Sequence, residues 1–127
     1  PSTGYFEWRH EGSKKIPYYI YLKDEPIFSM AGIYDTWLDK ETGEEHTTFS
    51  IITTETNPLT NYIHNTKHRM PTILSPEDEE KWLNPDLSKT EISSLLKPYD
   101  AKLMDAYIIE NDFIKKASTD PSILQRV

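Results

Sequence analysis

The first half of the chain carries the hydrophobic pattern of β-strands. Large apolar and polar side chains alternate in residues 5–9, aromatic and β-branched residues fill 16–22, and a mostly apolar run covers 27–38. Residues 47–54 are almost entirely β-branched or aromatic, which favours a strand. Polar turns separate these segments. We expect four antiparallel strands in meander order, with a bulge at Ala31-Gly32 in the third.

The second half shows helix signals instead. Residues 57–63 and 75–83 each begin with a capping residue followed by proline, and residues 88–96 begin with a Ser/Glu capping box. Residues 70–74 predict a short extended segment, and 103–109 a last strand. Strands followed by short helices predict an α+β fold, with a mainly antiparallel sheet and short peripheral helices. The length of 127 residues fits one domain.

Composition narrows the classes of function. The net charge is −7 and neither half of the chain is basic, so broad electrostatic binding to nucleic acid is not indicated. There is no cysteine, which excludes disulfides and thiolate metal sites and mildly favours the cytoplasm. No apolar run approaches the roughly 20 residues of a membrane span, so no membrane partner is expected. The chain opens almost directly in a strand without a methionine, and we expect it to be part of a longer protein.

The first strand places an acid among aromatic rings. Tyr5, Glu7 and Arg9 share one face, while Phe6 and Trp8 share the other, which is the better candidate for the packed side. A carboxylate in such surroundings is either paired or desolvated, and both conditions suit a residue that transfers protons. The alternative is a surface strand whose outer face happens to carry these polar groups.

A second candidate is the loop at residues 63–71, the densest cationic loop of an acidic chain. It contains His64, Lys67, His68 and Arg69. The spacing of the two histidines admits a metal site, but no further ligand is marked by spacing, and we expect no metal and no cofactor. A histidine here could instead exchange protons in concert with Glu7. The third interpretation is a solvated surface loop.

No nucleophile is visible in the chain itself. Cysteine is absent, no serine lies in a Gly-x-Ser-x-Gly setting, and no Gly-rich phosphate loop exists among the four glycines. The chain therefore contains a possible acid and a possible base but no visible nucleophile.

Two motifs resemble the SRAP family, the SOS-response-associated peptidases. They are residues 4–8 (GYFEW), and Ile63-His64 followed by residues 69–74 (RMPTIL). Connecting segments are similar as well: residues 17–20, 31–35, 51–55 and 111–127. The resemblance covers nearly the whole chain, but it corresponds only to the C-terminal part of the family domain. It implies a barrel-like fold for a single domain over residues 1–127 that lacks its N-terminal segment.

The resemblance also implies a function, the processing of abasic sites in single-stranded DNA during the DNA-damage (SOS) response. The family crosslinks to such sites through an N-terminal cysteine, which closes a thiazolidine ring with the abasic aldehyde. Its catalytic Glu carries over to Glu7, and its His best to His64. The longer spacing to Arg69 departs from the family pattern and leaves His68 as the weaker candidate. Arg69 is expected to contact a DNA phosphate, and Trp8 to offer a stacking surface to a base.

Other functions stay open. The family name implies a hydrolase or lyase, and the same fold could act as a peptidase on its own N-terminal extension. A non-enzymatic interaction module is the third possibility, favoured if Glu7 and His64 lay far apart. We expect the two side chains to face one cleft, since cooperation requires both to reach a shared substrate. Without the upstream cysteine, the segment itself is expected to be inactive.

Overall fold

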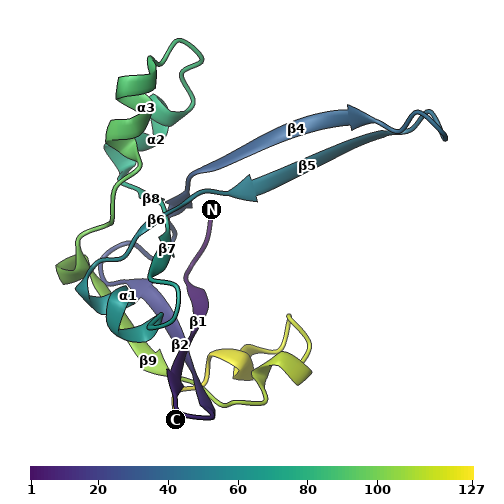
Figure 1. Cartoon of the computed structure of the whole chain (residues 1–127). Helices are drawn as coiled ribbons and strands as arrows, with labels where there is room; N and C mark the ends of the chain where they lie inside the picture. The colour runs from purple at the N-terminus through teal and green to yellow at the C-terminus, as the bar shows by residue number, and fades with distance from the viewer.

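The computed structural model describes all of residues 1–127. The strands are β1 (Tyr5–Glu11), β2 (Lys14–Leu22), β3 (Ser29–Met30), β4 (Gly32–Leu38), β5 (Glu45–Ile51), β6 (Thr53–Glu55), β7 (Arg69–Pro71), β8 (Ile73–Leu74) and β9 (Met104–Ile108) (Figure 1). The α-helices are α1 (Pro58–Ile63), α2 (Pro76–Trp82) and α3 (Lys89–Leu95). Single 3₁₀ turns cover Ala101–Leu103, Phe113–Lys115 and Pro121–Leu124.

A three-stranded antiparallel sheet in the order β1-β2-β9 forms the base of the structure. β1 and β2 are joined by a tight turn in which Gly12 takes a φ of +61°, a left-handed conformation that glycine adopts without strain. The sequence predicted this hairpin, and it predicted the last strand that becomes β9. Pro17 lies inside the central strand β2, but the pairing of β2 with β9 reaches only as far as Tyr18. The missing N–H of Pro17 therefore removes no hydrogen bond from that ladder.

Three two-stranded ribbons meet at a junction of three residues: Ala31, Ile52 and Thr72. The amide of Ala31 donates to the carbonyl of Thr72 at 2.8 Å, Ile52 to Ala31 at 2.9 Å, and Thr72 to Ile52 at 2.8 Å. The ribbons β3-β8, β4-β5 and β6-β7 extend from this triangle. Each chain segment therefore changes its pairing partner as it passes through the junction.

This junction overturns the predicted meander. The runs 27–38 and 47–54 are each cut in two, because the backbone groups of Ala31 and Ile52 bond within the triangle instead of in a ladder. The strands form four separate sheets, all with antiparallel pairing, and no closed barrel is found in the chain. The α+β class is confirmed, whereas the barrel-like arrangement is not seen, since β1 pairs on only one side.

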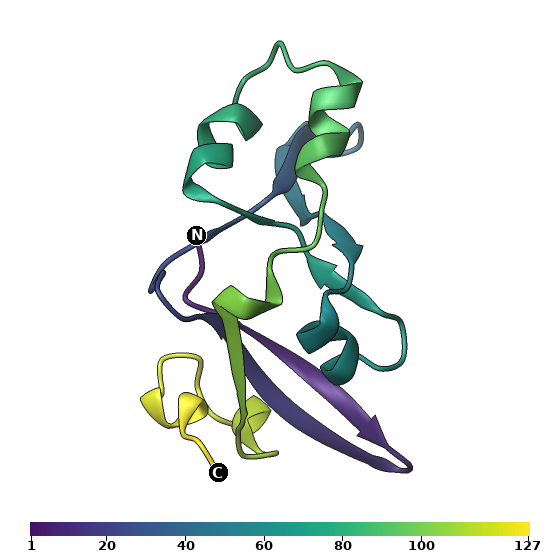
Figure 2. The ribbon, with the colours of Figure 1, turned by 90° about the vertical axis from the view of Figure 1, so that its left-hand side faces the viewer.

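The three α-helices begin where their capping residues predicted. Asn57 and Ser88 each accept a hydrogen bond from the third helical amide and complete a capping box. Ser75 precedes α2, but its side chain makes no capping bond. Figure 2 shows α2 and α3 together at one end of the molecule and the β1-β2 hairpin at the other. None of the helices has the length and apolar character that a membrane crossing requires.

Two apolar clusters cover the two faces of the β1-β2-β9 sheet. The larger contains Ile20, Leu22, Phe28, Ile63, Met70, Ile73 and Met104, and the smaller contains Tyr19, Ile109 and Phe113. Phe6 and Trp8 pack on the smaller cluster, while Tyr5 on the opposite face packs on the larger. The prediction that the Phe6/Trp8 face is the packed one is therefore incomplete, because α1 and β7 cover the other face.

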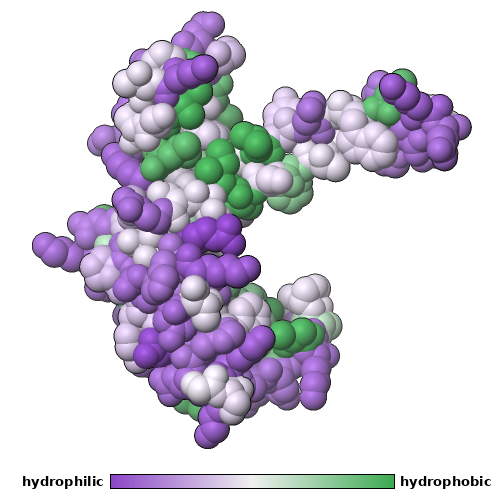
Figure 3. All heavy atoms as spheres, viewed as in Figure 1, coloured by the Kyte–Doolittle hydropathy of each residue, from purple (hydrophilic) through white to green (hydrophobic).

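The β4-β5 hairpin projects from the body as an arm (Figure 1). Its side chains are exposed on both faces, including Tyr34 at 78% and Phe49 at 77%. Figure 3 shows apolar atoms gathered where the arm leaves the body and hydrophilic atoms at its tip. The arm therefore takes almost no part in the core of this chain.

Candidate functional site

Helix α1 ends at His64 and places this residue next to the β1-β2-β9 sheet. Asn57 caps its first turn and is itself anchored, because its side-chain amide donates to the carbonyl of Tyr99 at 2.7 Å. Ile63 at the other end is fully buried in the larger cluster. His64 is the C-terminal cap residue, and its backbone amide donates to Thr60 at 2.7 Å. This six-residue helix is held at both ends, so it fixes the backbone position from which the His64 imidazole extends.

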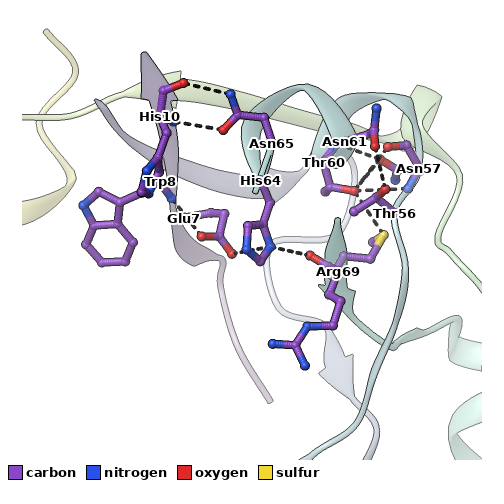
Figure 4. A network of polar contacts seen from close by, with 11 residues as sticks. Glu7, Trp8, His10, Thr56, Asn57, Thr60, Asn61, His64, Asn65 and Arg69 are labelled. Carbon is purple, nitrogen blue, oxygen red and sulfur yellow. Dashed lines mark hydrogen bonds and ion pairs between the residues drawn. The ribbon is translucent and has the colours of Figure 1, made fainter. Parts of the chain in front are cut away.

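The structure brings Glu7 and His64 together. The Oε2 atom of Glu7 lies 3.3 Å from Nδ1 of His64, and Oε1 accepts the backbone N–H of Trp8 at 2.9 Å (Figure 4). Both side chains are largely shielded, at 22% exposure for Glu7 and 16% for His64. Attraction between such groups is screened less than between fully exposed ones.

The neighbours of His64 define its tautomer. Nδ1 lies 2.8 Å from the carbonyl oxygen of Arg69, as well as beside the Glu7 carboxylate. Both of these oxygens can only accept a hydrogen bond, so Nδ1 carries the hydrogen. In the neutral ring, Nε2 then has the available lone pair, and in the charged ring Nε2 is a donor. The nitrogen that can exchange a proton with a ligand is therefore Nε2.

Glu7 and His64 line one cavity of about 360 Å³. Its other lining residues are Trp8, His10, Lys15, Thr66 and Ile114. One carboxylate thus faces two imidazoles and one ammonium group, so the cavity is locally more basic than the chain with its net charge of −7. The indole of Trp8 forms part of the wall and leans on Phe113, with ring centroids 5.7 Å apart.

Two contacts tie the α1 region to β1. The side chain of Asn65 accepts from the amide of His10 at 3.0 Å and donates to the carbonyl of His10 at 2.8 Å. The guanidinium of Arg9 lies 3.9 Å from the ring centroid of Tyr62 and donates to its backbone carbonyl. Asn65 follows His64 directly, and both contacts are made at residues that follow Glu7 in β1.

Two other cationic residues of the loop, His68 and Arg69, point elsewhere. His68 has a φ of +50°, and its Nδ1 lies 2.7 Å from the side-chain oxygen of Asn61. Arg69 contributes its carbonyl to His64, but its guanidinium extends away from the pair, is exposed and makes no ion pair (Figure 4). No group of three or more metal-ligating side chains converges here or elsewhere in the chain.

Tyr5 adds a neutral phenol beside the pair. Burial, and to a smaller degree the charge of Glu7, raises the pKa of Tyr5 above its ordinary value. Its hydroxyl is buried without a hydrogen-bond partner. The Tyr5 hydroxyl therefore stays protonated at neutral pH and takes no part in charge balance at the site.

Sequence reasoning did not single out several lining residues. His10, Lys15, Thr66 and Ile114 carried no motif, and Asn65 was only a loop residue. Proximity in the sequence to Glu7 or His64 could have suggested His10, Asn65 and Thr66. Nothing local marks Ile114, which reaches the cavity from the C-terminal segment.

Comparison with known proteins places the chain among relatives. A family model described as SOS response associated peptidase (SRAP) matches residues 1–115. The chain is 38% identical over 127 residues to the abasic site processing protein YoqW of Bacillus subtilis, covering 98% of this chain and 55% of that protein. It is 33% identical over 117 residues to the abasic site processing protein HMCES of Gallus gallus, covering 76% of this chain and 34% of that protein.

A solved structure is similar over nearly all of these residues. A crystal structure of a protein from Bacteroides thetaiotaomicron matches with a TM-score of 0.98 and 76% identity, covering 99% of this chain and 54% of that chain. The chain thus spans about half the length of YoqW and of this solved protein.

Proposed function

The chain belongs to the SRAP family, and from this we propose that the protein to which it contributes processes abasic sites in single-stranded DNA by covalent crosslinking. The observation that carries the proposal is the Glu7–His64 pair, joined at 3.3 Å on the wall of one cavity. The names of YoqW and HMCES as abasic site processing proteins support the choice of substrate. In this proposal, residues 1–127 are the C-terminal portion of a single domain in a protein of the cytoplasm.

The proposed nucleophile is an N-terminal cysteine outside residues 1–127, since this chain has none. Its α-amine adds to the aldehyde carbon of the opened abasic sugar, and loss of water gives a Schiff base. The thiol sulfur then adds to the same carbon, its proton passes to the nitrogen, and a thiazolidine ring closes. Each step moves protons between nitrogen, oxygen and sulfur, so a positioned acid and base should accelerate it.

The pair can divide these proton transfers. His64 presents Nε2 as the exchanging nitrogen, because the hydrogen on Nδ1 is donated to the carbonyl of Arg69 beside the Glu7 carboxylate. We assign to His64 the delivery of a proton to the sugar oxygen that departs as water when the Schiff base forms. Glu7 balances the imidazolium that exists before this delivery, and its carboxylate can accept a proton from the amine.

Binding of the strand is proposed to use cationic and aromatic side chains on the cavity wall together with Arg69 outside it. Arg69 is the proposed phosphate contact, and its exposed guanidinium has no competing carboxylate partner. Trp8 is the proposed stacking surface for a base next to the lesion, since it lines the same cavity as the pair. His10 and Lys15 add positive charge to this wall in a protein that is acidic overall.

A second candidate activity is suggested by the family description itself, which names a peptidase. The same site could remove an N-terminal extension and so expose the cysteine. A non-enzymatic interaction module would have been favoured by a large separation of Glu7 and His64, and the observed 3.3 Å gives it no support.

The test uses the full-length protein and three single-stranded oligonucleotides. One contains an abasic site, one a tetrahydrofuran analogue that has no aldehyde, and one is intact. We expect a band shifted on denaturing electrophoresis with the abasic strand only. A peptide that carries the protein's own N-terminal extension tests the peptidase activity. Cleavage of the peptide without any adduct would overturn the proposal in favour of the second candidate.

A further inference from the structure

The outer edge of β1 has no partner strand. β1 pairs with β2 alone, so every second residue directs its backbone groups away from the sheet. The amides of Trp8 and His10 lie on this edge, and both are satisfied by side chains. Glu7 accepts the first, and Asn65 accepts the second while donating to the carbonyl of the same residue.

We propose that Asn65 is a positioning residue for the Glu7–His64 pair. Its carboxamide bonds both backbone groups of His10, at 3.0 and 2.8 Å, as one residue of a neighbouring strand would. Because Asn65 follows His64 in the chain, this bond holds the imidazole against the strand that carries Glu7 (Figure 4). The inference deepens the proposed function, on which its catalytic consequence depends.

The geometry explains why the two hydrogen bonds between Asn65 and His10 matter. The Nδ1–Oε2 distance of 3.3 Å is already just beyond the usual range of an N–H···O hydrogen bond, so a small outward shift would separate the two groups. On its C-terminal side, His64 continues into a loop that contains the left-handed residue His68 and has no regular structure before β7. With Asn65 released, the ring could leave Glu7 and adopt the other tautomer, which would exchange protons through the wrong nitrogen.

The two hydrogen bonds to His10 also require an asparagine at position 65. An asparagine offers one acceptor and two donors at the end of a short side chain, which matches the N–H and C=O of a single residue. Aspartate would keep the acceptor but place a second oxygen against the His10 carbonyl. Alanine would lose both bonds and leave the edge to water.

The first measurement does not depend on activity. Nitrogen NMR of the histidine rings in the full-length protein should show His64 as the Nδ1–H tautomer. In Asn65→Ala, we expect the ring to become a mixture of both tautomers in exchange. Asn61→Ala is the matched control, because Asn61 lies in α1 and bonds the imidazole of the other histidine, His68, at 2.7 Å. It should leave the His64 signals unchanged.

The second measurement uses the full-length protein with abasic single-stranded DNA. Asn65→Ala should slow crosslinking by up to about 100-fold, the cost of a misplaced group near 1 Å, while the dissociation constant for intact DNA stays the same. Asn65→Asp should slow crosslinking less than Asn65→Ala does. If the alanine variant does not fold, the aspartate variant tests the positioning role instead. A wild-type rate together with an unchanged tautomer would overturn the inference.

The two measurements separate this inference from the proposed function. If the wild-type protein forms no adduct, the function fails, while the NMR comparison still reports whether Asn65 orders His64. If adducts form and Asn65→Ala loses both rate and DNA binding with its tautomer retained, the residue is structural and the positioning role is wrong.

Discussion

Single atoms decide what the Glu7–His64 pair can do. Nδ1 of His64 lies 2.8 Å from the carbonyl oxygen of Arg69 and 3.3 Å from Oε2 of Glu7, while Oε1 of Glu7 accepts the amide of Trp8. The exchange of a proton with a ligand is thereby directed to Nε2 of the imidazole. The neighbouring histidine, His68, has the same chemistry but faces Asn61 instead of a carboxylate.

The first prediction concerns this pair in the full-length protein. Glu7→Gln and His64→Ala should each slow crosslinking by about 10²–10⁴-fold, the usual cost of a lost general acid or base. The fold should persist, because β1 is held by Tyr5, Phe6 and Trp8 on its two faces. A single-turnover time course measures the rate, and His68→Ala is the control. Normal rates for both variants would mean that the pair is structural.

Arg69 should act through charge instead. In Arg69→Ala, we expect weaker binding of single-stranded DNA and a salt dependence reduced by about one phosphate contact, since one fewer counterion is released. Fluorescence anisotropy over a series of salt concentrations measures both quantities. The crosslinking rate at saturating DNA should stay near that of the wild type. A slope equal to that of the wild type would remove Arg69 from the DNA contacts.

At the scale of elements, short helices depend on their caps. The α3 capping box is complete: the amide and hydroxyl of Ser88 donate to Glu91 at 2.8 and 2.6 Å, and the amide of Glu91 donates back at 3.3 Å. These bonds, with the side chain of Ser88 first, lower the pKa of Glu91. The cap is therefore tied to the ionised carboxylate.

This predicts a pH response confined to α3. A carboxyl group with a lowered pKa stabilises the folded form above its unfolded pKa of about 4.3. That contribution is lost as the pH falls through the lowered value. The amide resonance of Ser88, followed by NMR from about pH 6 downwards, should shift in this acidic window and report fraying of the first turn. Glu91→Gln should show no such transition, and an identical response would exclude the cap as its cause.

The β4-β5 arm should be the least stable element of the isolated chain. Two-stranded hairpins are marginal in water, and Tyr34 and Phe49 on this one are 78% and 77% exposed. Hydrogen–deuterium exchange should therefore be faster in β4 and β5 than in β1 and β2, which pack on two apolar clusters. Equal protection in the two hairpins would show that the arm has support beyond its own pairing.

At the scale of the whole molecule, the proposed acid–base pair and the proposed nucleophile are separate. The pair lies on residues 1–127, whereas this chain contains no cysteine and matches about half the length of YoqW. The proposal therefore divides the residues that move protons from the group that forms the bond.

The chain alone should therefore form no covalent adduct. Incubation of the 127-residue chain with abasic single-stranded DNA should leave the oligonucleotide unshifted on denaturing electrophoresis, while the full-length protein shifts it. Added free cysteine offers a small-molecule control, because it can close the same ring with the aldehyde but cannot link it to the protein. A stable protein–DNA band from the chain alone would show a nucleophile within it.

The local rules of the sequence already determined much of this protein. Alternation in residues 5–9 placed Glu7 and Arg9 on one face, and the caps at Asn57 and Ser88 set where two helices begin. These features depend on neighbours within a few residues, so the pattern along the chain contains the information needed to predict them. The family motifs likewise pointed to Glu7 and His64.

Only the tertiary structure decided which strands pair and which histidine meets the acid. Except at proline, every residue has the same backbone N–H and C=O. No pattern of side chains therefore predicted that Ala31, Ile52 and Thr72 would bond in a triangle and divide the expected meander. Likewise, His64 and His68 have the same chemistry in one loop. Their surroundings differ because α1 ends at His64 and Asn65 bonds that end to the free edge of β1.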